Sequence, residues 1–494
     1  MTTKVSLTIA AMLGLGAISA CNSVSGVSDL EIGDRGPSVT PLSSLIEMPG
    51  LKVTEIALYQ GVKRPLMVGG VTATSDIPII DGRDAMMRVF IETDATFSGE
   101  PVTARLFFDQ DPVPIEITQN VVGNSTDDKL DSTFNFDVPG AKVSAAFGYK
   151  VLLGQSSGAF PRGPVAKPYP EKGYEPMPAE YVGATLKIMI APVAYGGDGS
   201  DRLPDLSDAQ IQMYTDAFHA MYPSPTVEIT VRPEPIAWKF PIGPGGNGWG
   251  ELLDHVGMVR QQDGAAPDVY YFAPFEPSAN FGQFCGGGCV AGLGMLGEAN
   301  DTHSRAAIGL GYPGDETGVT ALHEIGHNHG RNHAPCGGAQ GVDPKYPHPG
   351  AQDGVWGYNL VSQRLYDPKI TDIMGYCSPV WISDYNFIAL ATRIKLVNHA
   401  KMSFPPGSLN RVYDRVMIGP SGEVKWLEPM RLATPPFAEP ISLVIESKGM
   451  NETITGQLYR FDHLEGGIVF WPVSERAVSA VGLAVKGKQV RVAR

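Results

Sequence analysis

Four residues between positions 323 and 333 have the types and spacing of a catalytic zinc site. They belong to the pattern H-E-x-x-H-x-x-G-x-x-H. On a helix, His323 and His327 lie on one face a turn apart, so both imidazoles can reach one metal ion. Glu324 lies beside them, where its carboxylate could take a proton from a water molecule. His333 supplies a third imidazole, and three protein ligands leave one position open for water, as in catalytic rather than structural zinc sites.

The glycine of this pattern has a structural task. A helix that continued past His327 would carry His333 away from the metal. Gly330 accepts a positive φ without steric cost, so it can end the helix and let the chain turn back. His329 fits no ligand position, and we expect it beside the ligands or at the surface.

A second motif follows downstream, in Thr371-Asp-Ile-Met-Gly-Tyr-Cys377. Together with the long zinc pattern, it resembles the metzincin clan of zinc endopeptidases, over roughly residues 183–400. In that clan the motif is called the Met-turn, and we use this name for residues 371–377. The resemblance implies that Met374 forms an apolar floor under the imidazoles. It also implies that the Tyr376 hydroxyl reaches the zinc and later stabilises an oxyanion. The alternative is that Tyr376 is a core aromatic beside the cleft.

Four cysteines lie near these motifs. Cys336 and Cys377 each follow by three residues an element that must lie against the zinc, so a bridge between them is geometrically natural. Cys285 and Cys289 enclose three glycines and could close a short ring. The rival interpretation, a cysteine metal site, lacks a second pair at suitable spacing.

The start of the chain has the features of an export signal. Lys4 precedes an apolar run over residues 5–17, and Ile18-Ser-Ala-Cys21 follows. This ending resembles the bacterial lipobox, which implies a lipidated Cys21 and, with Asn22, an anchor in the bacterial outer membrane, at the periplasmic face or the cell surface. The alternative is an ordinary secreted protein with Cys21 buried or paired.

Periodicity and composition predict an α+β chain with β-rich flanking domains. The formal net charge of −14 argues against nucleic-acid binding. We also expect the protein to be a monomer. For the central domain, the resemblance to metzincins implies a twisted mixed sheet with a zinc helix and a Met-turn. The predicted parts are a lipoprotein signal peptide (1–20), a tether (21–45), a β-sandwich (46–155), a linker (156–182), the zinc peptidase domain (183–402) and a C-terminal β-domain (403–494). We expect the C-terminal β-domain to serve packing or presentation rather than catalysis.

These observations predict a zinc-dependent endopeptidase that acts on extracellular proteins or glycoproteins, with Glu324 as general base. The lipobox, the upstream β-domain and the cysteine-flanked core also resemble the secreted mucin-cleaving metallopeptidases of Gram-negative bacteria. Residues 289–295 form either an edge strand that pairs with extended substrate or a glycine-rich turn. Two other functions remain open, a surface adhesin without turnover and a zinc amidase that acts on peptidoglycan.

Overall fold

The computed structural model describes residues 48–155, 165–183, 185–400 and 411–494. The predicted signal peptide, the tether and Cys21 lie outside the described residues. Within the described ranges, the helices are too short or too polar to cross a membrane.

Two sheets in the first part of the chain share one apolar core. In one of their strands, β8 (Phe134–Val138), buried residues alternate with partly exposed ones, as in a strand with one face toward a core. In spatial order, the first sheet contains β20 (Arg364–Tyr366), β19 (Gly357–Asn359), β2 (Gly61–Val68), β1 (Leu51–Tyr59), β5 (Ala85–Thr93) and β8, with β3 (Val71–Thr72) paired to β2. The second contains β10 (Glu175–Pro176), β9 (Gly148–Gln155), β6 (Val102–Phe108) and β7 (Asp111–Gln119).

Strands β19 and β20 come from the segment between His333 and Met374, so this segment extends the N-terminal sheet. The indole of Trp381 also donates a hydrogen bond to the carbonyl of Gly61 at 2.9 Å. The N-terminal sheet is therefore bonded directly to the region that contains the predicted site.

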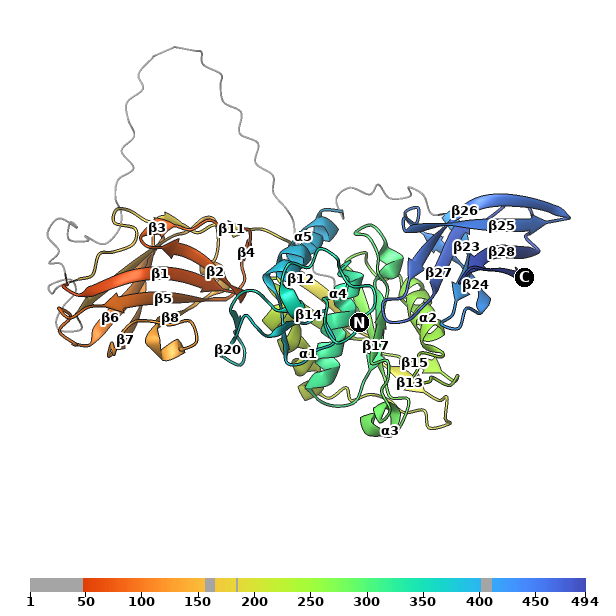
Figure 1. Cartoon of the computed structure of the whole chain (residues 1–494), viewed down its shortest axis with the longest axis horizontal. Helices are drawn as coiled ribbons and strands as arrows, with labels where there is room; N and C mark the ends of the chain where they lie inside the picture. The colour runs from red at the N-terminus through yellow and green to blue at the C-terminus, as the bar shows by residue number, and fades with distance from the viewer. Residues whose placement is uncertain (1–47, 156–164, 184, 401–410) are drawn as a thin grey trace, which may run out of the picture. The chain divides into compact units, whose positions relative to one another are not determined.

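A five-stranded sheet lies at the centre of the chain (Figure 1). Its order is β14 (Thr226–Val231), β12 (Thr185–Ile190), β16 (Val269–Phe275), β18 (Ala306–Leu310) and β17 (Gly292–Gly294). Neighbouring strands are parallel except β17, which runs antiparallel to β18 at the edge. Successive residues of β16 face opposite sides: Phe272 joins the core under α1, α4 and α5, and Tyr271 joins the core under α2.

Five α-helices occur in the described residues, and most belong to this central part. They are α1 (Asp208–Met221), α2 (Trp249–Gln262), α3 (Phe281–Cys285), α4 (Asp315–Asn328) and α5 (Asp384–Ala400). The Ser207 hydroxyl accepts a hydrogen bond from the Gln210 amide and caps α1, and Ser383 caps α5 through the Asn386 amide. These caps determine where the two helices begin.

The C-terminal residues form a seven-stranded antiparallel sheet. Its order is β24 (Val424–Leu432), β23 (Arg411–Ile418), β27 (Gly467–Pro472), β26 (Met450–Arg460), β25 (Glu439–Ser447), β28 (Ala480–Val485) and β29 (Lys488–Ala493). Met417 and Phe470 of this sheet lie in the same core as Trp249 of α2. The buried guanidinium of Arg415 also pairs with the carboxylate of Asp254 on α2. The C-terminal sheet is therefore packed against the central part through a shared core.

The predicted fold class is wrong. The structure is mostly β, with 40% strand and 17% helix, and it does not establish a metzincin-like α+β domain. The error has a physical cause. Apolar periodicity indicates long elements, but very short segments also pair into strands, such as β13 (Val193–Tyr195) with β15 (Ile236–Trp238) and β21 (Thr371–Asp372) with β22 (Val380–Trp381). Strands of two or three residues have too little pattern to recognise in sequence.

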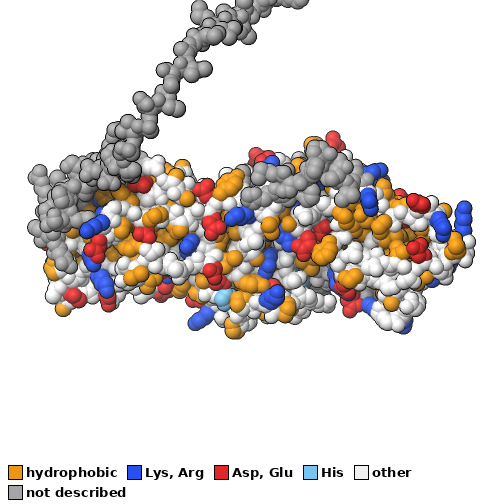
Figure 2. Space-filling model, turned by 90° about the horizontal axis from the view of Figure 1, so that it is seen from above, with side chains coloured by type: hydrophobic (Ala, Val, Ile, Leu, Met, Phe, Trp, Pro, Cys, Tyr) orange, Lys and Arg blue, Asp and Glu red, His pale blue; other side chains and the backbone are white. Residues whose placement is uncertain are grey.

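Acidic and basic side chains are interspersed on the face shown in Figure 2, with apolar side chains between them. The excess of acidic residues behind the net charge of −14 is therefore not gathered into one patch on that face.

Candidate metal centre

Helix α4 carries three of the predicted site residues into the interior. His323, Glu324 and His327 are 7%, 1% and 0% exposed. The centroids of the two imidazole rings are 4.8 Å apart, and their Nε2 atoms are 3.0 Å apart. The spacing of four residues thus brings both Nε2 atoms to one point.

The chain turns at Gly330 and returns with the third histidine. Helix α4 ends at Asn328, and Gly330 has a φ of +77° while its amide donates to the His327 carbonyl at 2.8 Å. The ring of His333 then lies 4.6 Å from that of His327 and 5.2 Å from that of His323. A left-handed residue is needed at this turn, which explains the glycine.

Backbone carbonyls orient all three imidazoles in the same way. The Nδ1–H groups of His323 and His327 donate to the carbonyls of Ile373 at 2.7 Å and Arg331 at 2.6 Å. The Nδ1–H of His333 donates to the carbonyl of Gln340. Because a carbonyl can only accept, the proton of each neutral ring is on Nδ1, and each Nε2 presents a lone pair.

The three rings are neutral because burial lowers the pKa of each, that of His327 to about 3. The Nε2 atoms of His323 and His327 are 3.0 Å apart, each with a lone pair directed at the other. Neither nitrogen carries a proton that could form a hydrogen bond between them. Such an arrangement is repulsive unless a cation lies between the nitrogens. The residues thus fit a metal ion, and the outward hydrogen bonds are those typical of metal-binding histidines.

The Met-turn lies against this group. Met374 is 1% exposed, and its sulfur packs so closely on Gly326 of α4 that a Cβ there would collide with it. The buried carboxylate of Asp372 holds the turn, since it accepts from the amides of Met374 at 2.7 Å and Ser383 at 2.9 Å. The Met374 carbonyl in turn accepts from the Ala334 amide at 2.9 Å. The turn is therefore bonded to the loop that carries His333.

Tyr376 reaches the same point with its hydroxyl. Its oxygen lies 3.1 Å from Nε2 of His333, and the side chain is 39% exposed. Burial of the phenol raises its pKa above the ordinary value, so the hydroxyl keeps its proton at neutral pH. The Tyr376 hydroxyl can act either as a hydrogen-bond donor or as a further metal ligand.

Two residues that the sequence analysis missed also belong to the group. Asp462 and His463 lie in the turn between β26 and β27 of the C-terminal sheet, and their ligand atoms lie within 4.8 Å of those of the three histidines. Oδ2 of Asp462 is 3.2 Å from Nε2 of His327. The ring of His463 stacks on Tyr376 with centroids 5.0 Å apart. The sequence signal for them is an Asp-His pair in a turn between two strands. This pair lies at no fixed distance in sequence from the zinc pattern, so the sequence does not connect the two.

Glu324 is buried beside these groups. A Cβ on Gly292 would collide with its carboxylate, and one of its oxygens, Oε2, has no hydrogen-bond partner. The other, Oε1, is 3.9 Å from Nε2 of His463. Burial and the neighbouring Asp462 carboxylate raise the pKa of Glu324 well above its ordinary value. A carboxylate of raised pKa with a free oxygen is suited to take up a proton.

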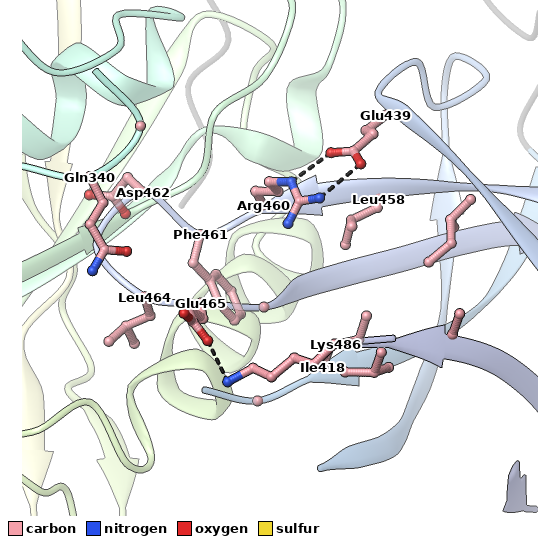
Figure 3. Close-up of a pocket in the computed structure, with 16 residues that line it drawn as sticks. Gln340, Ile418, Glu439, Leu458, Arg460, Phe461, Asp462, Leu464, Glu465 and Lys486 are labelled. Atoms are coloured by element: carbon pink, nitrogen blue, oxygen red, sulfur yellow. Dashed lines mark hydrogen bonds and ion pairs between the residues drawn. The ribbon is translucent and has the colours of Figure 1, made fainter. Parts of the chain in front are cut away.

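A cleft of about 440 Å³ opens over the site. Its lining combines site residues and apolar groups: Cys289, Ala291, Gly292, Glu316, Val319, Thr320, His323, Glu324, Ile373, Gly375, Tyr376, Cys377, Ser378, Val380 and His463. A larger cavity of about 680 Å³ lies beside the C-terminal sheet and is bordered by Asp462 and Gln340 (Figure 3). The cleft is the better candidate for substrate, because Glu324 and Tyr376 line it and neither lines the larger cavity.

The predicted substrate edge is only partly open. Strand β17 is at the edge of the central sheet, but the Gly294 amide donates to Oδ1 of Asp462 at 2.9 Å. Met295 pairs with Phe461 as an isolated bridge. Ala291 and Gly292 line the cleft, so any extended substrate would meet the first half of the segment.

Both cysteine pairs are at disulfide distance. Cys336 and Cys377 have Cα atoms 5.7 Å apart, and those of Cys285 and Cys289 are 4.8 Å apart. The first pair joins the loop after His333 to the Met-turn. In contrast, His329 is outside the ligand group: its Nδ1–H donates to the Ile325 carbonyl at 2.8 Å and its ring stacks on Tyr270.

Comparisons with known proteins do not identify a family. No family model matches the chain, and no curated protein matches it. One similar solved structure, "Structure of a chaperone-substrate complex", is 13% identical, with 54% of this chain and 40% of that chain covered and a TM-score of 0.23. The match spans less than half of that chain, and a likeness this low says nothing about fold or function. The resemblance to metzincins therefore rests on the sequence motifs alone.

Proposed function

We propose that this chain is a zinc-dependent endopeptidase that cleaves extracellular proteins or glycoproteins. The observation that carries the proposal is the convergence of three Nε2 lone pairs beside the free carboxylate oxygen of Glu324, under an open cleft. The long zinc pattern and the Met-turn motif, which resemble those of metzincins, support the same reaction.

The donor set favours zinc. Three imidazole nitrogens are ligands that Zn²⁺ accepts in tetrahedral sites, whereas Ca²⁺ and Mg²⁺ prefer oxygen. The metal would be held by His323, His327 and His333. A bound zinc ion would polarise the scissile carbonyl and make water nucleophilic at neutral pH.

Glu324 is the proton carrier. Its free oxygen can accept a proton from the attacking water, and the same group can then give the proton to the leaving amine. The raised pKa helps the second step, because a carboxyl of high pKa remains protonated until the amine departs. The close approach of Gly292 leaves the carboxylate little room to move.

Tyr376 is the oxyanion donor. Its hydroxyl lies within the ligand group while its ring borders the cleft, so it can turn from His333 to a substrate oxygen. A phenol that keeps its proton can donate to the negative charge that forms on that oxygen.

Export and attachment through Cys21 to the bacterial outer membrane are part of this proposal, and they rest on the signal-like start of the chain. The segment at the cleft offers glycine backbone at Gly292, which an extended chain could meet through main-chain hydrogen bonds. We therefore expect recognition of extended chains.

The proposal is tested with purified full-length protein on mixed denatured proteins, a mucin-type glycoprotein and muropeptides. We expect new peptide-bond cleavage in the first two, loss of cleavage with a zinc chelator and recovery with zinc. Cleavage confined to muropeptides would instead identify an amidase, and binding without cleavage would favour an adhesin. The variant Asp315→Asn, at the exposed start of α4, is the control for changes that do not reach the site.

A further inference from the structure

We propose that Asp462 is a fourth protein ligand of the same metal ion, so that the C-terminal sheet completes the metal centre. The inference rests on the proposed metal site but not on peptidase activity. It gives the C-terminal sheet a chemical role in place of the packing or presentation expected from sequence.

The first argument is the spacing of the donor atoms. Oδ2 of Asp462 lies 3.2 Å from Nε2 of His327, and the Nε2 atoms of His323 and His327 are 3.0 Å apart. Two ligands at about 2.0–2.1 Å from one tetrahedral zinc ion are about 3.3 Å apart. The carboxylate oxygen thus occupies the position of a neighbouring ligand.

The second argument is the hydrogen bonding. Nε2 of His327 presents a lone pair because its Nδ1–H donates to the Arg331 carbonyl. A carboxylate oxygen also presents lone pairs, so no ordinary hydrogen bond explains their contact. A shared cation explains both this contact and the one between His323 and His327.

The third argument is the way in which Asp462 is held. It is 6% exposed, and its other oxygen, Oδ1, accepts from the Gly294 amide at the edge of the central sheet. Phe461, the preceding residue, pairs with Met295 and packs its ring on Gly250 of α2. One carboxylate oxygen is therefore fixed by backbone while the other faces the imidazoles.

The sheet that carries Asp462 is built into the structure. It shares a core with α2, and the buried Arg415 pairs with Asp254 across the same contact. Asp462 is consequently a permanent member of the site and not a segment resting on its surface. Catalytic zinc can take five ligands, so a fourth protein ligand still leaves a position toward the cleft.

His463 offers a competing explanation, because Asp462 also contacts Nδ1 of His463. In that case Asp462 would only orient the His463 ring against Tyr376 and would not touch the metal. The two roles differ in a property of the metal itself, its coordination, which can be measured without any substrate.

The test is Asp462→Asn, which keeps the size of the side chain and an oxygen for the Gly294 amide but removes the charge. The control is Glu465→Gln on the same turn, whose carboxylate pairs with Lys486 and is not part of the metal-binding group (Figure 3). Zinc affinity is measured by competition with a coloured chelator, and coordination by the visible spectrum of the Co²⁺-loaded protein.

We expect Asp462→Asn to weaken zinc binding by about 10²-fold or more and to shift the Co²⁺ bands, with Glu465→Gln like the parent protein. Affinity within about threefold of the parent and an unchanged Co²⁺ spectrum would overturn the assignment. A thermal melt of the metal-free variants shows whether the turn remains folded. If the parent protein itself binds no zinc, the proposed function fails instead, so the two failures are distinguishable.

Discussion

The hydroxyl oxygen of Tyr376 lies 3.1 Å from Nε2 of His333, whose other ring nitrogen is held by the Gln340 carbonyl. The oxygen of this tyrosine, and not only its ring, therefore lies beside the imidazoles. Tyr376→Phe removes that oxygen alone. We expect kcat to fall by about 10²-fold with little change in KM, since the donor acts mainly in the transition state. Steady-state kinetics on a cleaved peptide measures both constants.

A matched control for this change is Tyr312→Phe. The hydroxyl of Tyr312 bonds to Ser278 and does not line the cleft, so its loss should leave kcat unchanged. Equal kcat values for Tyr376→Phe and the parent protein would return Tyr376 to the role of a packing aromatic.

Opening the bridge between Cys336 and Cys377 should weaken metal retention. The bridge spans 41 residues and ties the loop after His333 to the Met-turn, a closure worth roughly 4 kcal/mol in the chain-entropy model. The double serine variant should melt at lower temperature and release zinc faster to a chelator, because both segments that border the metal gain freedom.

The second cysteine pair is the control for that experiment. Cys285 and Cys289 are only four residues apart, so replacing both should cost roughly 2 kcal/mol in the same model and leave zinc release unchanged. Equal zinc release from the two double variants would show that the longer bridge does not support the metal centre.

Acid should destabilise the contact between the C-terminal sheet and the central part of the chain, because the buried His303 lies at this contact. This imidazole is enclosed by Tyr459 and Phe470 of that sheet, and burial lowers its pKa to about 3, with Arg415 adding to the shift. The unfolded chain has a histidine pKa of about 6.5, so it binds the extra proton between pH 6.5 and 3. Stability is therefore full above pH 6.5 and falls as the pH decreases through that window.

His303→Leu isolates this effect, and Nε2 of His303 has no hydrogen-bond partner that the change would leave unpaired. Between pH 6 and 4, the parent should lose up to about 1.4 kcal/mol per pH unit more than the variant in denaturant melts. Parallel pH profiles would show that His303 does not carry the acid sensitivity.

The local parts of the site could be predicted from sequence because they depend on short-range spacing. The interval from His323 to His327 requires only helical geometry, and Gly330 only a turn with positive φ. The pairing of Cys336 with Cys377 followed from two motifs that had to meet at one metal.

Asp462 and His463 could not be predicted in this way. They reach the site because the C-terminal sheet packs on α2 through Met417 and Phe470, a tertiary contact that leaves no periodic trace near residue 462. The fold class failed for a related reason: β19 pairs with β2, a strand far earlier in the chain, and β20 pairs in turn with β19. Such short paired segments look like loops in sequence.

The most direct test of the account is the comparison of zinc content and peptide hydrolysis in the parent protein and Glu324→Gln. The change keeps the shape of the side chain against Gly292 and removes no imidazole ligand. We predict about one zinc ion per chain in both proteins and a loss of turnover of at least about 10²-fold in the variant, as expected when a proton carrier is removed. A zinc-loaded Glu324→Gln protein with near-parental hydrolysis would contradict the proposed mechanism.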